Sequence, residues 1–408
     1  MTYHALLHRN VAAILPTVDG LELALKHAET EGRILRAYLG LDPSSPHLHI
    51  GHSIPLRKLA HVQDAGHQAI LLIGDFTARL GDPTDKGAVR VALTKEQVEG
   101  NMQSYLAQVA HILDLKGEQA GHLPVEIRYN SEWSDDMTFS AVVKLAENFT
   151  VQQMLERDMF AKRLLEQKPI SLSEFFYPLM QGYDAVALEA DIQIGGTDQT
   201  FNMLAGRTLN RILRQKEMFV LATPLLADKN GVKIGKTQGN AINIDNPANE
   251  LFGQLMSLPD ETIEPGLTYL TDMPEGEISL IHNALNGGEN PMEFKKQLAF
   301  IVVESYHGKE VASEAADHFY KTVQQGQTPD EVEERVVDGA EWDILDLLMT
   351  LGATDSRSDA RRLVQGGAVE IDGQRLESNH ISLAESTLLK VGKRQYFKLH
   401  VSEQEKNL

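Results

Sequence analysis

The first half of the chain alternates short apolar runs with stretches whose apolar residues recur three and four positions apart. Such alternation is typical of parallel strands joined by crossover helices. The apolar runs predict strands over residues 34–41, 68–74, 125–129, 190–194 and 219–226, and the helical patterns predict helices over 53–65, 139–145, 151–165 and 173–188. A further helix is expected from Thr94, which forms a capping-box pattern with Gln97 ahead of apolar positions that continue to Ile112. These elements predict an α/β domain with a parallel sheet over residues 1–240.

The pattern changes after residue 247. Helical spacing over 251–258, 277–285, 291–306 and 311–323, with glycine and proline breaks, predicts a mostly helical domain at 241–325. The stretch 326–341 holds six acidic residues against the single Arg335, together with Pro329 and two glycines, and we interpret it as an acidic linker. Beyond it, helical patterns at 344–351 and 358–364 and apolar runs at 368–371 and 388–399 predict a small α+β module at 342–408.

Composition excludes several classes of protein. The 408 residues are 42% hydrophobic and 24% charged, an ordinary balance for a chain with a sizeable core. There is no cysteine, which excludes a disulfide scaffold, a thiol nucleophile and a cysteine-ligated metal site. No apolar run approaches the roughly 20 residues of a membrane helix, and the first ten residues lack the apolar core of a secretory signal. A cytoplasmic, multidomain protein without a membrane segment is expected.

Charge is distributed unevenly along the chain. The formal net charge is −20, which counts against non-specific DNA binding. Between residues 357 and 398, however, eight Lys or Arg residues stand against five Asp or Glu residues, so the sign is reversed in the last module. That module is where the residues favour nucleic-acid binding.

One candidate site lies between the first of the predicted strands and the helix after it. The segment 38–52 runs from a strand end to a helix start, the position at which open α/β sheets bind ligands, and it ends with His49, Gly51 and His52. A helix N-terminus offers N–H groups to phosphate, the glycine lets the backbone approach a ligand, and the imidazoles can donate to phosphoryl oxygens. A metal-binding histidine pair is the alternative, although no obvious third ligand stands nearby.

A second candidate is the segment 233–237, which follows the strand at 219–226. It contains Lys233, Gly235, Lys236 and Thr237. Two lysines flanking a glycine can grip a polyphosphate as point charges. Taken alone, these lysines are more simply interpreted as part of a solvated surface loop.

A third candidate is the helix predicted over 173–188. Tyr177, Gln181 and Asp184 share one face of it, because they lie four and three positions apart. Aromatic and aliphatic residues interleave with these polar ones, which is unusual for a solvated face. The next strand end adds amide and carboxylate groups, at Gln193, Asp198 and Gln199.

Taken together, the first two segments resemble the signature motifs of class I aminoacyl-tRNA synthetases. His49-Ile50-Gly51-His52 matches the first signature in full, and the two lysines and a hydroxyl of the second, Lys-Met-Ser-Lys-Ser, are retained at 233–237. The third segment narrows the resemblance to tyrosyl-tRNA synthetases of the bacterial type, over nearly the whole chain. It is joined by a Tyr-x-Gly-x-Asp opening at 38–42, Gly81-Asp82-Pro83, and Gly-Gly-Thr-Asp-Gln at 195–199. The last module is similar to the S4-type RNA-binding domain that ends those enzymes.

The resemblance implies a Rossmann-like catalytic domain and a role for each candidate residue. Tyr38 and Asp184 would hydrogen-bond the tyrosine phenol, and the α-ammonium would be held by Asp82, Tyr177 and Gln181, with Gln193 in support. The adenosine pocket would be lined by Asp42, Gly51 and Asp198, with Gln199 nearby. The phosphates would be contacted by Ser44, His49, His52, Lys86, Arg90, Lys233 and Lys236. The basic residues of the last module that would bind tRNA are Arg357, Arg361, Arg362, Lys393 and Arg394.

The implied activity is ATP-dependent activation of L-tyrosine to tyrosyl-adenylate, with release of pyrophosphate, followed by transfer to the terminal ribose of tRNA(Tyr). Mg²⁺ is expected with ATP, held mainly by phosphates and water, and no structural metal or tightly bound cofactor is expected. The resemblance also implies a homodimer, with the insertion at 130–170 as its surface. Three alternatives stay open: a tryptophanyl-tRNA synthetase, a small-molecule nucleotidyltransferase, and a synthetase-like RNA-binding protein without catalysis.

Overall fold

The structure is a computed structural model that describes residues 3–82, 93–227, 233–234, 241–325, 332–354, 356–376, 379–384, 386–392 and 395–402. The chain divides into two compact units. The first comprises Met1–Pro247 and Gln254–Gly308, and the second comprises Ala248–Gly253 and Lys309–Leu408. The helical region predicted at 241–325 is therefore shared between the two units. No helix within the described ranges is long and apolar enough to cross a membrane.

Six strands form the sheet of the first unit: β1 (Ala13–Leu15), β2 (Arg36–Leu41), β3 (Gln68–Ile73), β4 (Glu126–Tyr129), β5 (Ile192–Gly196) and β6 (Phe219–Thr223). Their order is β1-β6-β5-β2-β3-β4, and every neighbouring pair is parallel except β1 with β6. β3 is buried at all but its first residue, as expected for a parallel strand covered on both faces. The five parallel strands confirm the predicted sheet, whereas β1 has no counterpart among the predicted strands.

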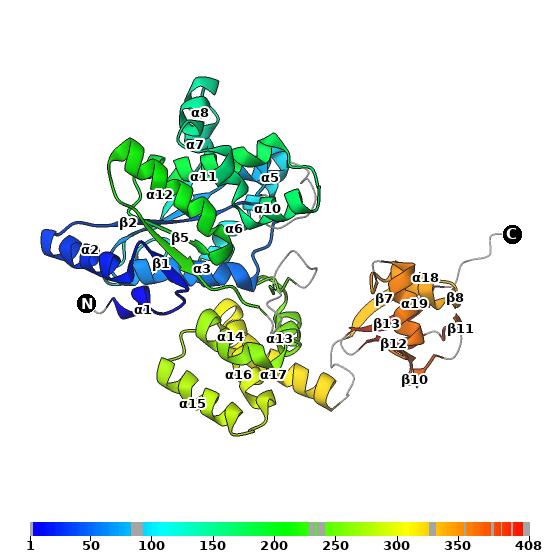
Figure 1. The fold of residues 1–408 in the computed structure, drawn as a ribbon. Helices are drawn as coiled ribbons and strands as arrows, with labels where there is room; N and C mark the ends of the chain where they lie inside the picture. Colours follow the sequence, from blue (N-terminus) through cyan, green and yellow to red (C-terminus); the bar gives the residue numbers. More distant parts are fainter. Residues whose placement is uncertain are drawn as a thin grey trace. The chain divides into compact units, whose positions relative to one another are not determined.

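Helices cover both faces of this sheet. α3 (Ile50–Asp64) contacts β2, β3 and β5 on one face, while α11 (Phe176–Ala187) and α12 (Thr200–Arg214) pack together over the other (Figure 1). The first unit also contains α1 (His4–Leu7), α2 (Val18–Glu31), α4 (Thr77–Leu80), α5 (Lys95–Met102), α6 (Tyr105–Val109), α7 (Ser131–Ser134), α8 (Phe139–Ala146), α9 (Val151–Leu155), α10 (Asp158–Leu165), α14 (Ile263–Leu270), α15 (Glu275–Asn286) and α16 (Pro291–His307). Short 3₁₀ turns at Leu172–Phe175, Thr197–Gln199 and Asp260–Thr262 precede α11, α12 and α14.

Two of the predicted helices are interrupted. Thr94 caps α5 through a capping box with Gln97, as expected, but α5 ends at Met102 and α6 begins at Tyr105. The pattern over 151–165 likewise divides into α9 and α10, with Arg157 at the start of the second. Apolar periodicity continues across both bends, so it does not reveal where the backbone hydrogen-bond ladder stops.

The carboxyl ends of β2 and β5 mark the point where the sheet changes direction. From β2 the sheet extends through β3 to β4, and from β5 it extends through β6 in the opposite direction. Open α/β sheets bind ligands in the crevice outside such a point. The fold therefore predicts a site between β2 and β5.

Helices of the segment 254–308 hold α3 from its far side. The hydroxyl oxygens of Ser53 and Tyr306 lie 2.7 Å apart in a buried contact between α3 and α16. One turn further along α3, Arg57 Nη1 donates to Asp272 Oδ2 at 2.7 Å. Ser53 and Arg57 follow His52 within the next two turns of α3. The segment 254–308 therefore holds in place the helix that begins with the histidine motif.

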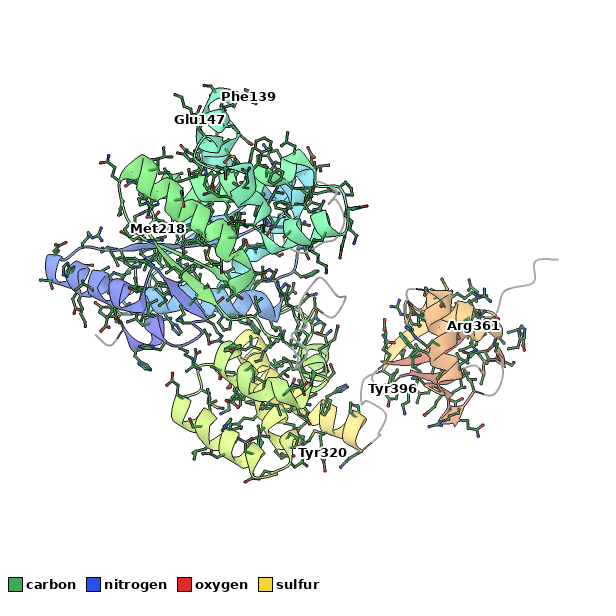
Figure 2. The ribbon with its side chains drawn as sticks, viewed as in Figure 1. Phe139, Glu147, Met218, Tyr320, Arg361 and Tyr396 are labelled. Atoms are coloured by element: carbon green, nitrogen blue, oxygen red, sulfur yellow. The ribbon has the colours of Figure 1, made fainter. Side chains whose placement is uncertain are left out.

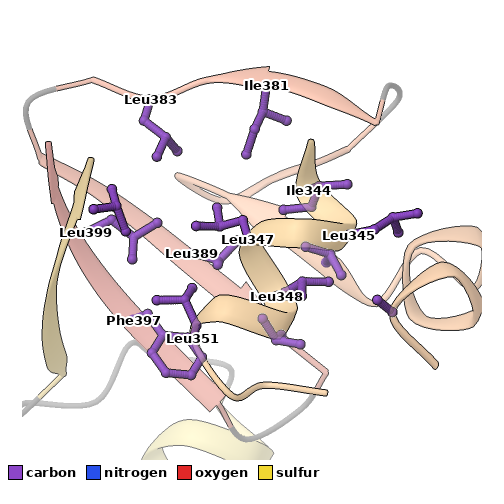
Figure 3. Close-up of a cluster of buried hydrophobic side chains, with 14 residues drawn as sticks. Ile344, Leu345, Leu347, Leu348, Leu351, Ile381, Leu383, Leu389, Phe397 and Leu399 are labelled. Carbon is purple, nitrogen blue, oxygen red and sulfur yellow. The ribbon is translucent and has the colours of Figure 1, made fainter. Parts of the chain in front are cut away.

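The second unit is built on a five-stranded sheet in the order β10-β9-β12-β13-β7, with a separate β11-β8 pair. The strands are β7 (Glu333–Asp338), β8 (Glu341–Asp343), β9 (Val369–Ile371), β10 (Gln374–Arg375), β11 (His380–Ser382), β12 (Ser386–Val391) and β13 (Gln395–Ser402). The remaining helices of the chain are α13 (Ala248–Met256), α17 (Lys309–Phe319), α18 (Ile344–Thr350) and α19 (Arg357–Gln365), with a π-helical turn at Tyr320–Gln324. Leu347 of α18 packs with Leu389 and Leu399 of the sheet in one apolar cluster (Figure 3).

The predicted acidic linker at 326–341 is wrong for its second half. Residues 333–338 form β7, which pairs parallel to β13 with Glu333 opposite Phe397. Val337 is buried in the apolar cluster, and Lys398 Nζ donates to Glu334 Oε1 at 2.9 Å. Most of β7 is exposed at the edge of the sheet, where charged side chains are common. Its composition therefore resembled that of a linker.

Candidate active site

A cavity of about 270 Å³ opens where the switch point of the sheet predicts it. The candidate residues that line it come from β2, α3, α11 and β5, and from the segments that follow β2, α4, β5 and β6. They are Tyr38, Asp42, His49, Gly51, His52, Asp82, Tyr177, Gln181, Asp184, Gln193, Asp198, Gln199 and Lys233. Ser44 is not part of the lining, and Lys86, Arg90 and Lys236 lie outside the described residues.

Tyr38 and Gln193 form the floor of the cavity. They are register partners on the parallel strands β2 and β5, so their side chains point to the same face of the sheet. Tyr38 is 1% exposed and Gln193 is 2% exposed. Within the described part of the chain, the Tyr38 hydroxyl and the Oε1 atoms of Gln193 and Gln181 are buried without a hydrogen-bond partner. Buried polar atoms are almost always paired in folded proteins, so three such atoms beside one cavity indicate a polar ligand.

Asp184 faces the same space from α11 and is held by two residues that sequence reasoning missed. Trp133 Nε1 donates to its Oδ1 at 2.9 Å, and Asn130 Nδ2 donates to its Oδ2 at 3.2 Å. Burial raises the pKa of Asp184 to about 8, against the effect of these two hydrogen bonds and with a smaller contribution from the nearby Asp42 carboxylate. Tyr38 and Asp184 line the same cavity, and burial and then the Asp184 charge raise the pKa of Tyr38 well above its usual range.

Tyr177 links α11 to the end of β2. Its hydroxyl donates to Asp42 Oδ2 at 2.9 Å, and Thr77 Oγ1 donates to the other oxygen of Asp42 at 2.7 Å. Thr77 in turn accepts a hydrogen bond from Asn130 Nδ2 at 2.9 Å. A continuous chain of hydrogen bonds therefore joins Asp42 to Asp184 across the cavity wall.

The two histidines of the motif cap α3 with their own side chains. His49 Nδ1 accepts from the Gly51 N–H at 3.1 Å, and His52 Nδ1 accepts from the His49 N–H at 3.1 Å. The rings stack with their centroids 3.7 Å apart. Because Nδ1 accepts in both rings, each neutral imidazole carries its proton on Nε2, which can donate to an oxyanion.

The first two residues of the lysine segment, Lys233 and Ile234, lie beside this helix start. A Cβ atom built on Gly51 would lie 2.9 Å from the His49 ring, so a larger residue would displace that ring, and it would lie 3.8 Å from the Ile234 carbonyl oxygen. Lys233 Nζ donates to Asp198 Oδ2 at 3.0 Å. Lys233 therefore lines the same cavity as His49 and His52, although it is far from them in the sequence.

The alternative of a metal-binding histidine pair finds no support in the arrangement. Among the described residues, no group of three or more His, Cys, Asp or Glu side chains could hold a metal ion. In the last module, Arg361 is exposed on α19 (Figure 2). Arg357 pairs with Asp346 and Arg362 pairs with Asp359, while Lys393 and Arg394 lie outside the described residues.

Two family models match the chain. Residues 30–324 match the model of the class I tRNA synthetases (W and Y), and residues 323–399 match the C-terminal domain of SYY-like tyrosine–tRNA ligases. The tyrosine–tRNA ligase of Thermotoga maritima is 42% identical over 406 residues and covers 98% of each chain. That of Symbiobacterium thermophilum is 42% identical over 388 residues, which are 94% of this chain and 93% of its own.

Solved structures agree on the fold. The C-terminally truncated mitochondrial tyrosyl-tRNA synthetase of Aspergillus nidulans has a TM-score of 0.64 at 24% identity, covering 78% of this chain and 92% of its own. The tyrosyl-tRNA synthetase of Archaeoglobus fulgidus, solved with L-tyrosine, has a TM-score of 0.58 at 21% identity and covers 77% and 98%.

The parallel sheet, the capped histidine motif and the match over most of the chain define a class I aminoacyl-tRNA synthetase. Its relatives at about 40% identity over nearly their whole length act on tyrosine. The chain belongs to the tyrosine–tRNA ligase family, whose members use ATP to join tyrosine to tRNA. The alternatives of a tryptophan enzyme, a small-molecule nucleotidyltransferase and a non-catalytic RNA-binding protein are therefore set aside.

Proposed function

We propose that the cavity holds L-tyrosine at its floor and ATP toward the histidine and lysine segments, and that tyrosyl-adenylate forms between them. The observation that carries this proposal is the set of three buried, unpartnered polar atoms, on Tyr38, Gln181 and Gln193, beside the fixed carboxyl of Asp184. These groups have no hydrogen-bond partner among the described residues, and they match the polar groups of a bound amino acid.

The phenol of the substrate would lie between Tyr38 and Asp184. A phenol hydroxyl both donates and accepts, so it can donate to the carboxyl and accept from the Tyr38 hydroxyl. Phenylalanine would bury the same ring and leave both groups unsatisfied, which costs the desolvation of each. Discrimination between the two amino acids therefore needs no separate editing site.

The α-ammonium would be held by Asp82, Tyr177 and Gln181, with Gln193 in support. Asp82 offers a carboxylate, Tyr177 a hydroxyl oxygen, and Gln181 the unpartnered amide oxygen described above. Three acceptors around one ammonium satisfy its three donors.

For ATP, we assign the adenosine to Asp42, Gly51 and Asp198 with Gln199 nearby, and the phosphates to the cationic and hydroxyl groups Ser44, His49, His52, Lys86, Arg90, Lys233 and Lys236. Attack of the tyrosine carboxylate on the α-phosphorus expels pyrophosphate, so negative charge grows on the leaving phosphates. Donors fixed before the reaction stabilise that charge without reorganising. Mg²⁺ would accompany ATP, held mainly by phosphates and water, and would neutralise part of the same charge.

The chain organisation supports further proposals. We assign residues 1–240 to catalysis, 241–325 to a helical anticodon-binding domain, and 342–408 to S4-like RNA binding through its basic residues. A homodimer through the segment 130–170 is supported by exposed apolar side chains on α8, α9 and α10, with Phe139 80% exposed at the start of α8 (Figure 2). A cytoplasmic location fits an enzyme of translation.

Amino-acid-dependent pyrophosphate exchange tests the proposal. We expect exchange with L-tyrosine and at least a thousand-fold less with phenylalanine or tryptophan, and we expect Lys236→Ala to lower the rate about 100-fold or more. Lys26→Ala, which changes an exposed lysine on α2, is the matched control and should leave the rate unchanged. Full activity of Lys236→Ala would overturn the role given to the lysine segment.

A further inference from the structure

A buried arginine reaches the carboxylate that the proposed function assigns to the substrate ammonium. Arg157 lies directly before α10, its side chain is 5% exposed, and its Nη2 donates to Asp82 Oδ1 at 3.0 Å. Gln199 Nε2 donates to the other oxygen, Asp82 Oδ2, at 2.6 Å. Both oxygens of Asp82 are thus held by side chains from distant parts of the chain, which fixes the plane of the carboxylate.

The guanidinium group of Arg157 is itself held in place. It lies 5.7 Å from the centre of the Phe201 ring and 6.0 Å from that of Phe160, distances at which a planar cation is attracted to an aromatic face. Phe160 is fully buried, so this support is part of the core. Arg157 is absent from the cavity lining, whereas Asp82 and Gln199 belong to it.

We propose that Arg157 is a positioning residue for amino-acid recognition, which aims the Asp82 carboxylate at the α-ammonium of the substrate. The inference rests on the proposed role of Asp82 and adds a residue that the motifs do not contain. A carboxylate already fixed in its binding orientation loses less conformational freedom when the ammonium binds. The entropic cost of binding is therefore lower, and the affinity for the ammonium is higher. Arg157 also keeps the Asp82 carboxylate paired with a cation before the substrate binds.

The contribution of Arg157 to ammonium binding can be measured with two phenols that differ only in the ammonium group. Tyramine carries the ammonium and 4-ethylphenol lacks it, while both fill the ring slot. Their inhibition constants against tyrosine in pyrophosphate exchange give an ammonium preference, defined as the ratio of the two constants. We expect Arg157→Met to reduce that preference about ten-fold, because it weakens the binding of tyramine. The inhibition constant of 4-ethylphenol should change by less than two-fold.

Three further variants complete the experiment. Arg157→Lys keeps the charge and should recover part of the lost preference, and it serves as the test variant if Arg157→Met fails to fold. Arg163→Met is the matched control, since Arg163 lies within α10, is 3% exposed and pairs with Glu174 away from the cavity lining. It should lower the melting temperature as Arg157→Met does, and leave the ammonium preference unchanged. Asp82→Asn should reduce the preference at least as much as Arg157→Met.

The outcomes separate the two proposals. If Asp82→Asn reduces the preference and the Arg157 variants do not, Asp82 binds the ammonium without help from Arg157 and the inference is wrong. The same holds if Arg163→Met reduces the preference as much as Arg157→Met, because the arginine would then act only through stability. If Asp82→Asn leaves the preference unchanged, the assigned role of Asp82 fails, and the inference fails with it.

Discussion

Tyr38 and Gln193 are register partners on adjacent parallel strands, and each ends in a buried polar atom without a partner in the described residues. They lie on either side of the line where the sheet reverses direction. Unpaired polar atoms cost stability in the ligand-free protein. At this position the cost is consistent with a ligand that supplies the missing partners.

Replacing Tyr38 by phenylalanine should therefore separate stability from binding. The ring keeps its apolar packing, and in the part of the chain that the structure describes the lost hydroxyl leaves no partner unpaired. We expect Tyr38→Phe to leave the free energy of unfolding unchanged or to raise it by up to about 1 kcal/mol, and to raise KM for tyrosine about ten-fold. Urea unfolding without ligand and pyrophosphate exchange measure the two effects.

A second buried tyrosine provides the control. Tyr105 is 2% exposed, and its hydroxyl donates to the Ser45 carbonyl oxygen at 2.8 Å. Tyr105→Phe should lose about 1 kcal/mol of stability, because that carbonyl loses its donor. Equal destabilisation by the two substitutions would mean that the Tyr38 hydroxyl has a partner within the protein.

Asp184 should make the ligand-free protein less stable as pH rises. Burial raises the pKa of Asp184 to about 8, whereas an aspartate in the unfolded chain titrates at about 3.9. The folded state therefore keeps a proton that the unfolded chain releases, and the stabilisation present below pH ~4 is lost as pH rises toward 8. Asp184→Asn lacks this titration. Its free energy of unfolding, relative to that of the wild type, should therefore rise by about 2–4 kcal/mol between pH 5 and pH 8.

Urea unfolding at pH 5, 6.5 and 8 without tyrosine checks this prediction. The quantity of interest is the difference in unfolding free energy between Asp184→Asn and wild type, since other titrating groups cancel in it. A difference that is the same at all three pH values would contradict a raised pKa for Asp184.

Ser53 and Tyr306 should be coupled in stability. Their hydroxyl oxygens lie 2.7 Å apart in a buried contact between α3 and α16. Ser53→Ala and Tyr306→Phe each remove one side of the contact, and we expect the double variant to lose about 1 kcal/mol less than the sum of the two single losses. Thermal or urea unfolding of the four proteins measures this coupling, and strict additivity would show that the two hydroxyls do not interact.

The proposed dimer surface can be tested at Phe139. Its side chain is 80% exposed at the start of α8, and a two-fold symmetric interface would bury it twice. We expect Phe139→Ser to weaken dimerisation about 100-fold, measured by sedimentation at several protein concentrations. Leu280→Ser on α15, where the side chain is 68% exposed, is the matched control and should leave dimerisation unchanged. An unaltered dimer in Phe139→Ser would place the interface elsewhere.

The strands and the groups at their ends could be predicted from the sequence because they depend on local patterns. The apolar run at 68–74 must be buried on both faces, and the helix positions of Tyr177, Gln181 and Asp184 follow from their spacing. Such patterns place polar groups on a common edge of the sheet and explain why most of the candidate residues meet at one cavity.

The residues that orient the site could not be predicted in the same way. Trp133 contacts Asp184 from 51 positions away in the sequence, and Arg157 contacts Asp82 from 75 positions away. Neither residue belongs to a motif: Trp133 lies in α7, a helix that the sequence did not predict, and Arg157 lies at the break within the helix predicted over 151–165. Contacts of this kind depend on how the insertion folds back over the sheet, which no local pattern contains.

The order of strands in the second unit has a consequence for how this part of the protein forms. β13 lies between β12 and β7, although it follows both in the chain. Glu333 at the start of β7 therefore cannot pair with Phe397, its partner on β13, until that later strand has been made. During synthesis β7 cannot pair with β13 until residues 395–402 have left the ribosome, so the sheet of the second unit closes only after all six strands of the first unit's sheet have been made.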